Sequence, residues 1–323
     1  MTSRHLLAPE VAPIFEAMPP VDLTTEGLPA FRAEADAGMA QLLGLDHLDL
    51  SGQTLSERFI PGAPGDPDVR VLVLEPQGGT APRPAILETH LGGHVAGKPE
   101  QSLGIYGPLA RELGAVLVMV DYRLSPGTRF PGGLEDAYAA LKWLIGQAQA
   151  LNIDPQRIGL LGTSAGGGLA AGLALWARDR DAIPLAHLHL IQPMLDDRTG
   201  TDPDNWPYNG EYGWSRQNNA FGWQARLGTV PGGEDVSPYA APARMADLSG
   251  LPSTFISCGS IDLFTGESIA FAQRLMQAGV ATELHISPGL PHGGQIGTKG
   301  PLIDTINDTD IAAWKRAFGV AAA

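Results

Sequence analysis

Short apolar runs recur along the chain at lengths typical of β-strands. Several are apolar on successive residues, which indicates strands that are covered on both faces. Between them lie segments with the apolar spacing of amphipathic helices. The predicted strands are 69–76, 84–90, 115–123, 157–164, 185–193, 253–259 and 281–288, and the predicted helices are about 102–113, 134–151, 165–180, 267–279 and 309–320. This alternation predicts an α/β fold, in which a largely parallel sheet has helices on both faces.

Two regions depart from this alternation. Residues 1–50 are helix-like and acidic, and they precede the first predicted strand. Residues 196–235 are rich in loop-forming residues and hold three of the six tryptophans, Trp206, Trp214 and Trp223. The aromatic side chains of such an insertion can pack against the core or line an apolar ligand pocket, and the two interpretations are compatible.

Composition narrows the class of protein. The chain has 323 residues, of which 44% are apolar and 17% charged, as in globular proteins. The net charge of −14 argues against nucleic acid or an anionic membrane surface as a partner. We expect neither a signal peptide nor a membrane span, because the N-terminus lacks a long apolar run and no run approaches about 18 residues. With Cys258 as the one cysteine, no intramolecular disulfide can form, and a cytoplasmic location is expected.

The motif that carries most chemistry is Gly162-Thr163-Ser164-Ala165-Gly166, between a predicted strand and a predicted helix. A serine on so sharp a turn has a strained backbone, and side chains two residues to either side would collide. Glycine at 162 and 166 relieves that collision. The turn presents the serine hydroxyl at the carboxyl end of the sheet, beside the free N–H groups of a helix N-terminus. Ser164 is therefore the predicted nucleophile.

A nucleophilic serine needs a base, and the base needs an acid to orient it. On a fold of this kind the expected order is serine, acid, histidine. Of the histidines that follow Ser164, His187, His189 and His285 lie inside apolar strand patterns. His292 instead follows the last predicted strand, in a loop of glycine and proline. We therefore predict His292 as the base.

Four carboxylates are candidates for the acid. Asp262 directly follows a predicted strand, thirty residues before His292. Asp196 and Asp197 follow the preceding strand, where some enzymes of this type place the acid. Glu267 lies in the first turn of a predicted helix, where the helix dipole already explains a carboxylate. Asp262 is the predicted acid.

The segment "ETHLGGHVAGK", residues 88–98, contains two histidines four residues apart, His90 and His94. That spacing forms a metal site when a helix places both rings on one face. Gly92 and Gly93 follow a predicted strand and make a helix unfavourable here, and no nearby side chain completes a ligand set. We therefore predict no metal site and no cofactor.

Five spaced motifs together resemble the hormone-sensitive-lipase branch of α/β-hydrolase fold esterases. They are "GTSAGG", "DYRLSPGTRFPGGLEDAYAALKWL", "VSPYAAPARMADLSGLP", "GSIDLF" and "ELHISPGLPHGG". The resemblance runs from about residue 55 to 320 and implies an eight-stranded, mostly parallel sheet. It also implies a catalytic domain over 51–323, with a cap built from the helices of 1–50 and the insertion at about 196–235. Members of this branch commonly pair through the last strand and helix, so a homodimer is expected.

The resemblance also implies which backbone groups bind the oxyanion. This sequence departs from the usual family pattern in two places. The resemblance implies that the N–H groups of Gly92, Gly93 and Ala165 hold the negatively charged oxygen formed on attack, while His90 braces the loop. The family usually has Asp where this chain has Thr163, as in the branch's Gly-Thr-Ser-Ala-Gly subgroup. In the loop, the usual His-Gly-Gly-Gly-aromatic reads His-Leu-Gly-Gly-His here.

These observations predict a carboxylic-ester hydrolase that cleaves short- to medium-chain acyl esters of small molecules through an acyl-enzyme intermediate. The same residues could serve amide hydrolysis or acyl transfer to another alcohol. A non-catalytic receptor for a small ligand is the alternative from another class. Receptors in this branch have lost the histidine that His292 supplies.

Overall fold

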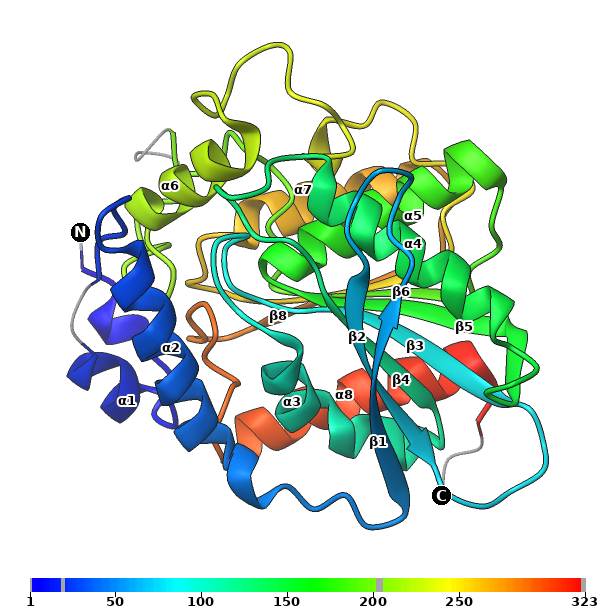
Figure 1. Ribbon diagram of the computed structural model, residues 1–323. Coiled ribbons are helices and arrows are strands. Elements are labelled where there is room, and N and C mark those ends of the chain that lie inside the picture. Colours follow the sequence, from blue (N-terminus) through cyan, green and yellow to red (C-terminus); the bar gives the residue numbers. More distant parts are fainter. Residues whose placement is uncertain (1, 19–20, 202–205, 321–323) are drawn as a thin grey trace.

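One eight-stranded sheet runs through the molecule, with the strands in the order β1-β2-β4-β3-β5-β6-β7-β8 (Figure 1). The structure is a computed structural model that describes residues 2–18, 21–201 and 206–320. The strands are β1 Gln53–Ile60, β2 Val69–Pro76, β3 Arg83–Thr89, β4 Val116–Asp121, β5 Ile153–Thr163, β6 His187–Ile191, β7 Ser253–Gly259 and β8 Thr282–Ser287. β2 is antiparallel to both β1 and β4, and all other neighbours are parallel. The predicted α/β fold with a mostly parallel eight-stranded sheet is confirmed.

The apolar pattern alone indicated seven strands and missed β1. β1 lies at the edge of the sheet, and most of its residues are exposed or half-buried. Phe59 is 65% exposed, whereas Ile60 is buried. Because an edge strand faces the core with only part of its surface, its sequence lacks the continuous apolar run of the central strands.

Helices cover both faces of the sheet. α3 and α8 pack on one face, where Leu103 and Trp314 meet Ile86 of β3. α4, α5 and α7 pack on the other face, where Leu141 and Leu169 are part of the main core. The helices are α1 Ala12–Ala17, α2 Leu28–Leu43, α3 Pro99–Leu113, α4 Gly132–Gly146, α5 Ala165–Asp181, α6 Arg216–Leu227, α7 Thr265–Gln277 and α8 Pro301–Phe318.

The predicted helix boundaries lie within three residues of the observed ones except at two ends. α8 begins at Pro301, eight residues before the predicted start, because proline is well suited to the first turn of a helix. α4 ends at Gly146, five residues earlier than predicted. None of the helices in the described part of the chain is long and apolar enough to cross a membrane.

The N-terminal helices and the insertion between β6 and β7 lie on the same side of the molecule, where Figure 1 shows α1, α2 and α6 together. Asn218 of α6 connects them. Its side chain accepts a hydrogen bond from the Leu23 N–H (2.9 Å) and donates one to the Val21 carbonyl (2.8 Å). Arg32 of α2 donates to the carbonyl of Val95, beyond β3, at 2.6 Å. These bonds tie both segments to each other and to the sheet's carboxyl end.

Candidate active site

Ser164 stands on a sharp turn between β5 and α5. Its backbone has φ 57° and ψ −122°, a conformation that non-glycine residues seldom adopt. A Cβ at Gly162 would lie 2.2 Å from the Gly166 carbonyl oxygen, and a Cβ at Gly166 would lie 1.9 Å from the Thr89 carbonyl oxygen. The collision predicted from the sequence is therefore real, and only glycine at both positions permits the turn.

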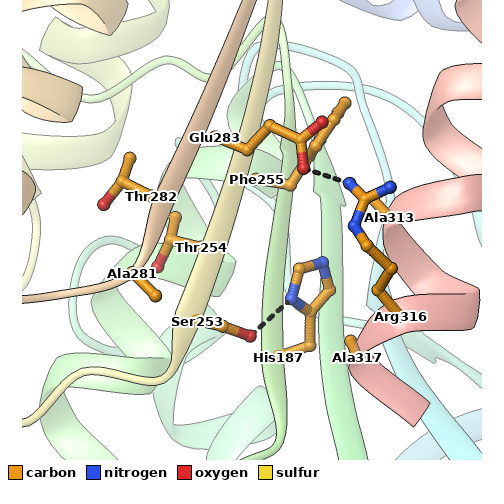
Figure 2. A pocket seen from close by; sticks show the side chains of 10 residues that line it. All are labelled: His187, Ser253, Thr254, Phe255, Ala281, Thr282, Glu283, Ala313, Arg316 and Ala317. Atoms are coloured by element: carbon orange, nitrogen blue, oxygen red, sulfur yellow. Dashed lines mark hydrogen bonds and ion pairs between the residues drawn. The ribbon is translucent and has the colours of Figure 1, made fainter. Parts of the chain in front are cut away.

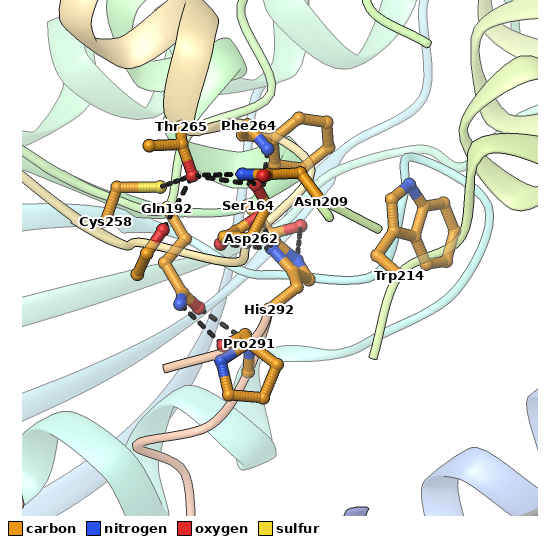
Figure 3. Close-up of polar contacts among 12 residues, drawn as sticks. Ser164, Gln192, Asn209, Trp214, Cys258, Asp262, Phe264, Thr265, Pro291 and His292 are labelled. Carbon is orange, nitrogen blue, oxygen red and sulfur yellow. Dashed lines mark hydrogen bonds and ion pairs between the residues drawn. The ribbon is translucent and has the colours of Figure 1, made fainter. Parts of the chain in front are cut away.

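Ser164, His292 and Asp262 form one hydrogen-bonded chain (Figure 3). The Ser164 Oγ lies 2.9 Å from His292 Nε2, and His292 Nδ1 lies 2.9 Å from Asp262 Oδ2. Because the Asp262 carboxylate only accepts hydrogen bonds, Nδ1 carries the imidazole proton and Nε2 is free to accept from the serine hydroxyl. The structure thus brings together the three residues that the sequence singled out.

Neighbouring groups hold the side chains of Asp262 and His292 in place. Asp262 is fully buried, and its Oδ1 accepts a hydrogen bond from the backbone N–H of Phe264 at 2.9 Å. The Phe264 ring meets the His292 ring edge-on, with centroids 5.0 Å apart. Asn209 donates to the backbone carbonyl of Asp262 at 2.6 Å. The carboxylate and the imidazole therefore have little freedom to rotate.

Gln192, which the sequence analysis did not single out, holds the loop that carries His292. Its side chain donates to the Pro291 carbonyl (3.1 Å) and accepts from the Gly293 N–H (2.7 Å). These two bonds lie on either side of His292, and Gln192 is itself buried. Its place directly after β6, at the carboxyl end of the sheet, is the one sequence signal that points to it.

The other carboxylates have partners of their own. Asp196 pairs with Arg198 at 2.7 Å, and buried Asp197 pairs with Arg244 at 2.6 Å. Glu267 accepts from the Leu195 N–H at 2.7 Å, and burial raises its pKa well above the usual value. His292 is hydrogen-bonded to none of these three groups.

The other three histidines that follow Ser164 lie in strands of the sheet, as predicted. His187 lines a pocket of about 300 Å³ near the edge of the sheet, together with Glu283 and Arg316 (Figure 2). Burial lowers the pKa of His187 and of His189 to about 3, so both are neutral at physiological pH. His285 pairs with Glu283 at 2.7 Å on the edge strand β8.

The glycines after β3 are needed for their conformation. Gly92 and Gly93 have φ angles of 127° and 61°. A Cβ at Gly92 would lie 2.0 Å from the Ala96 carbonyl oxygen, and one at Gly93 would lie 2.3 Å from Cη2 of Trp214. The backbone can therefore pack this closely against Ala96 and Trp214 only because both residues are glycine.

The two histidines of this loop turn to different neighbours. His90 Nδ1 bonds to the Leu91 carbonyl at 2.8 Å, and its ring stacks on Tyr122 with centroids 4.1 Å apart. His94 Nδ1 instead accepts from the guanidinium of Arg226 at 2.7 Å. A shared metal would need both rings to converge on one point, and these contacts hold each ring elsewhere. Thr163, the other departure from the family pattern, is hydrogen-bonded to the hydroxyl of Tyr106.

The three tryptophans of the insertion have different environments. Trp223 is fully buried, and Trp206 is 42% exposed. Trp214 lies beside the three-residue chain (Figure 3), with its six-membered ring against the α-carbon of Gly93. The preceding residue, Gly213, packs on the backbone of His292, since a Cβ there would lie 2.2 Å from the His292 carbonyl oxygen. Trp214 thus packs on Gly93, while the buried ring of Trp223 lies beside His94, with ring centroids 6.0 Å apart.

Comparison with known proteins identifies the family. A profile described as the alpha/beta hydrolase fold matches residues 86–296. The chain is 31% identical over 307 residues to the carboxylesterase NlhH of Mycobacterium tuberculosis, covering 91% of each chain. It is also 31% identical over 208 residues to an ethyl acetate hydrolase of Pseudomonas putida, covering 64% of this chain and 65% of that protein.

Solved structures agree with the sequence comparison. A bacterial heroin esterase superposes with a TM-score of 0.92 at 39% identity, covering 98% of this chain and 99% of that one. The esterase LipW of Mycobacterium marinum has a TM-score of 0.86 at 30% identity, covering 98% and 97%. The chain therefore belongs to the α/β-hydrolase fold family, and the resemblance to the hormone-sensitive-lipase branch of esterases is confirmed.

Removing either end of the Ser164–His292 hydrogen bond should abolish ester hydrolysis. We expect Ser164→Ala and His292→Ala each to lower kcat for p-nitrophenyl acetate by about 10⁴–10⁶, and the double variant to lose little more, since the groups act as a unit. Near-wild-type hydrolysis by either single variant would contradict the assignment.

The acid can be tested with a matched pair of amide substitutions. Asp262→Asn should lower kcat by about 10⁴, because the amide holds the imidazole in the wrong tautomer. Asp196→Asn, which alters only the pair with Arg198, is the control and should keep activity within a few-fold. Asp197→Asn breaks a buried ion pair and should lower Tm without a comparable loss of kcat. Equal losses of kcat in all three variants would refute the choice of Asp262.

Proposed function

We propose that this protein is a carboxylesterase that cleaves esters of small molecules by acyl transfer through Ser164, His292 and Asp262. The observation that carries the proposal is the 2.9 Å contact between Ser164 Oγ and His292 Nε2, with Nδ1 held by a buried carboxylate. His292 removes the serine proton as Oγ attacks the ester carbonyl, then donates that proton to the leaving alcohol. Water, activated in the same way, releases the acid and restores the serine. Asp262 fixes the tautomer and stabilises the imidazolium.

The oxygen of the tetrahedral intermediate is held by the N–H groups of Gly92, Gly93 and Ala165. Ala165 is the first residue of α5, so its N–H belongs to the free donors of a helix N-terminus. The positive φ angles of the two glycines and their close packing support a fixed backbone in this loop. Fixed donors stabilise a developing negative charge because they need no reorganisation during the reaction.

Three other functions are compatible with the same scaffold. Amide hydrolysis or acyl transfer would proceed through the same serine. Relative rates on matched ester and amide substrates separate amide hydrolysis from ester hydrolysis, and the products formed with an added alcohol separate acyl transfer. A non-catalytic receptor is disfavoured, since His292 is present and hydrogen-bonded to Ser164.

We assign residues 1–50 and the insertion at about 196–235 to a cap over the catalytic domain 51–323. The bonds of Asn218 to Val21 and Leu23 support this division, because they join the two segments. Trp214 brings an aromatic ring from the insertion to the glycine loop. A cap of ordinary helices fitted so closely favours short- to medium-chain acyl groups over long-chain lipids.

We also propose a cytoplasmic homodimer, in which two copies pair through β8 and α8. β8 is an edge strand, and all six of its residues are only half-buried, so its free backbone groups can pair with a second copy. Sedimentation velocity distinguishes the dimer from a single chain. The cytoplasmic location rests on the single, buried Cys258, which suits a reducing compartment.

Chain-length preference should depend on Trp214. In a p-nitrophenyl ester series from acetate to palmitate, we expect the wild type to prefer acyl chains of up to about eight carbons, and Trp214→Ala to shift the preference to longer chains because it removes a large side chain at the loop. Exposed Trp206→Ala is the control and should keep the wild-type profile, whereas fully buried Trp223→Ala should mainly lower Tm. An unchanged profile in Trp214→Ala, or a jump in rate when a long-chain substrate forms micelles, would count against the proposed cap.

A side chain at Gly93 should damage catalysis more than substrate binding. We expect Gly93→Val to lower kcat by about 10²–10³, the typical cost of losing one donor to the oxyanion, with a smaller change in KM, because the oxyanion exists only after attack. Gly38→Val in α2, where a Cβ meets nothing within 4 Å, is the control for the substitution itself. Adding Trp214→Ala to Gly93→Val should not restore kcat if the lost N–H donor is the cause. Full recovery would show that crowding by the indole was responsible.

A further inference from the structure

Arg226, in the last turn of α6, is buried, although arginine side chains usually lie at the protein surface. Its Nη1 donates to His94 Nδ1 at 2.7 Å, and the guanidinium lies 5.8 Å from the centre of the Phe130 ring. Nε and Nη2 are buried and have no hydrogen-bond partner among the described residues. Two strong donors are therefore left without an acceptor from the described protein.

The charge of Arg226 is also unbalanced. Within the described part of the chain, no carboxylate lies within 4 Å of the guanidinium, although buried charges are normally paired. Burial lowers the pKa of Arg226 to about 10, so the group is still charged at physiological pH. The nearby guanidinium of Arg123 already pairs with Asp66 and Asp136. The carbonyl end of the α6 dipole supplies only a partial negative charge.

A small cavity adjoins this guanidinium. Its volume of about 10 Å³ is at the lower limit for a single water-sized species, and its lining includes His94, Ser125, Thr128, Arg129 and Arg226. Arg129 is exposed, so the cavity lies next to solvent on that side. Burial and the charge of Arg226 keep the pKa of His94 well below its usual value, so its neutral ring accepts from Arg226. The donors around the space are guanidinium groups, since the hydroxyls of Ser125 and Tyr122 already donate to backbone carbonyls.

We propose that this cavity is a halide site, in which one chloride ion accepts hydrogen bonds from Nε and Nη2 of Arg226 and balances its charge. We commit to a monatomic anion because it needs the least space. The net charge of −14 disfavours unspecific anion binding over the rest of the surface, so the affinity must come from this local group of cations.

The site reaches the catalytic loop through His94. His94 directly follows Gly93 and has a φ of 64°, and its carbonyl accepts from the Ser125 N–H at 2.9 Å. An ion that fixes Arg226 therefore also fixes the residue next to a proposed oxyanion donor. We expect halide to raise kcat as well as stability, because both depend on the same backbone segment.

The direct test is a crystal structure of the wild-type protein grown in sodium bromide. Bromide scatters anomalously and water does not, so the proposal requires an anomalous peak within hydrogen-bond distance of Arg226 Nε and Nη2. A cavity that holds only a water molecule, with no anomalous signal at saturating bromide, would overturn it.

The chloride dependence of Tm, compared between the wild type and two arginine variants, provides a second test. When chloride replaces gluconate at constant ionic strength, the wild-type Tm should rise by about 2 °C at ten times the Kd, since an ion that binds only the folded state stabilises it. Arg226→Met keeps the side-chain length without the charge and should lose this dependence. Arg4→Met removes an exposed, paired arginine and should keep it. Equal chloride dependence in all three proteins would also refute the site, and the bromide crystal decides the question if Arg226→Met does not fold.

Discussion

The strained turn at Ser164 is the constraint on which the rest of the site depends. A non-glycine residue at φ 57° and ψ −122° persists only where the surroundings leave it no alternative. Here β5 enters the turn, α5 leaves it, and the backbones at Gly162, Gly166 and Thr89 pass so closely that no Cβ fits. The turn aims Oγ at His292, and α5 begins directly after it at Ala165, so the first N–H of the helix lies next to the serine in the chain.

The partners of Ser164 come from separate strand ends, and each is held by contacts outside the reacting groups. Gln192 bonds to the residues on either side of His292, and Gly213 packs on its backbone. Asn209 supports the backbone of Asp262. The insertion between β6 and β7 supplies two of these three, so it helps to hold His292 and Asp262 in place. Such positioning matters because catalysis falls steeply when groups move by about 1 Å.

The sequence was sufficient for those parts of the structure that local rules determine. Buried strands and the turn at Ser164 leave short-range patterns, and both were found. Asp262 and His292 were found from their places directly after strands. Edge strand β1 was missed because half-exposed strands carry no continuous apolar run. Arg226 gave no signal either, since an arginine near the end of a helix looks like a surface residue. Its burial, like the different environments of Trp214 and Trp223, results from tertiary packing between distant segments.

We expect Ser164 to be the nucleophile, and covalent labelling can identify the reactive side chain. A reactive organophosphate ester transfers its phosphoryl group to an activated serine and stops at that stage. We expect one adduct per chain, located on Ser164 by peptide mass spectrometry, and we expect esterase activity to fall in proportion to labelling. Ser164→Ala should take up no label. An adduct on another residue, or activity that survives complete labelling of Ser164, would contradict the account.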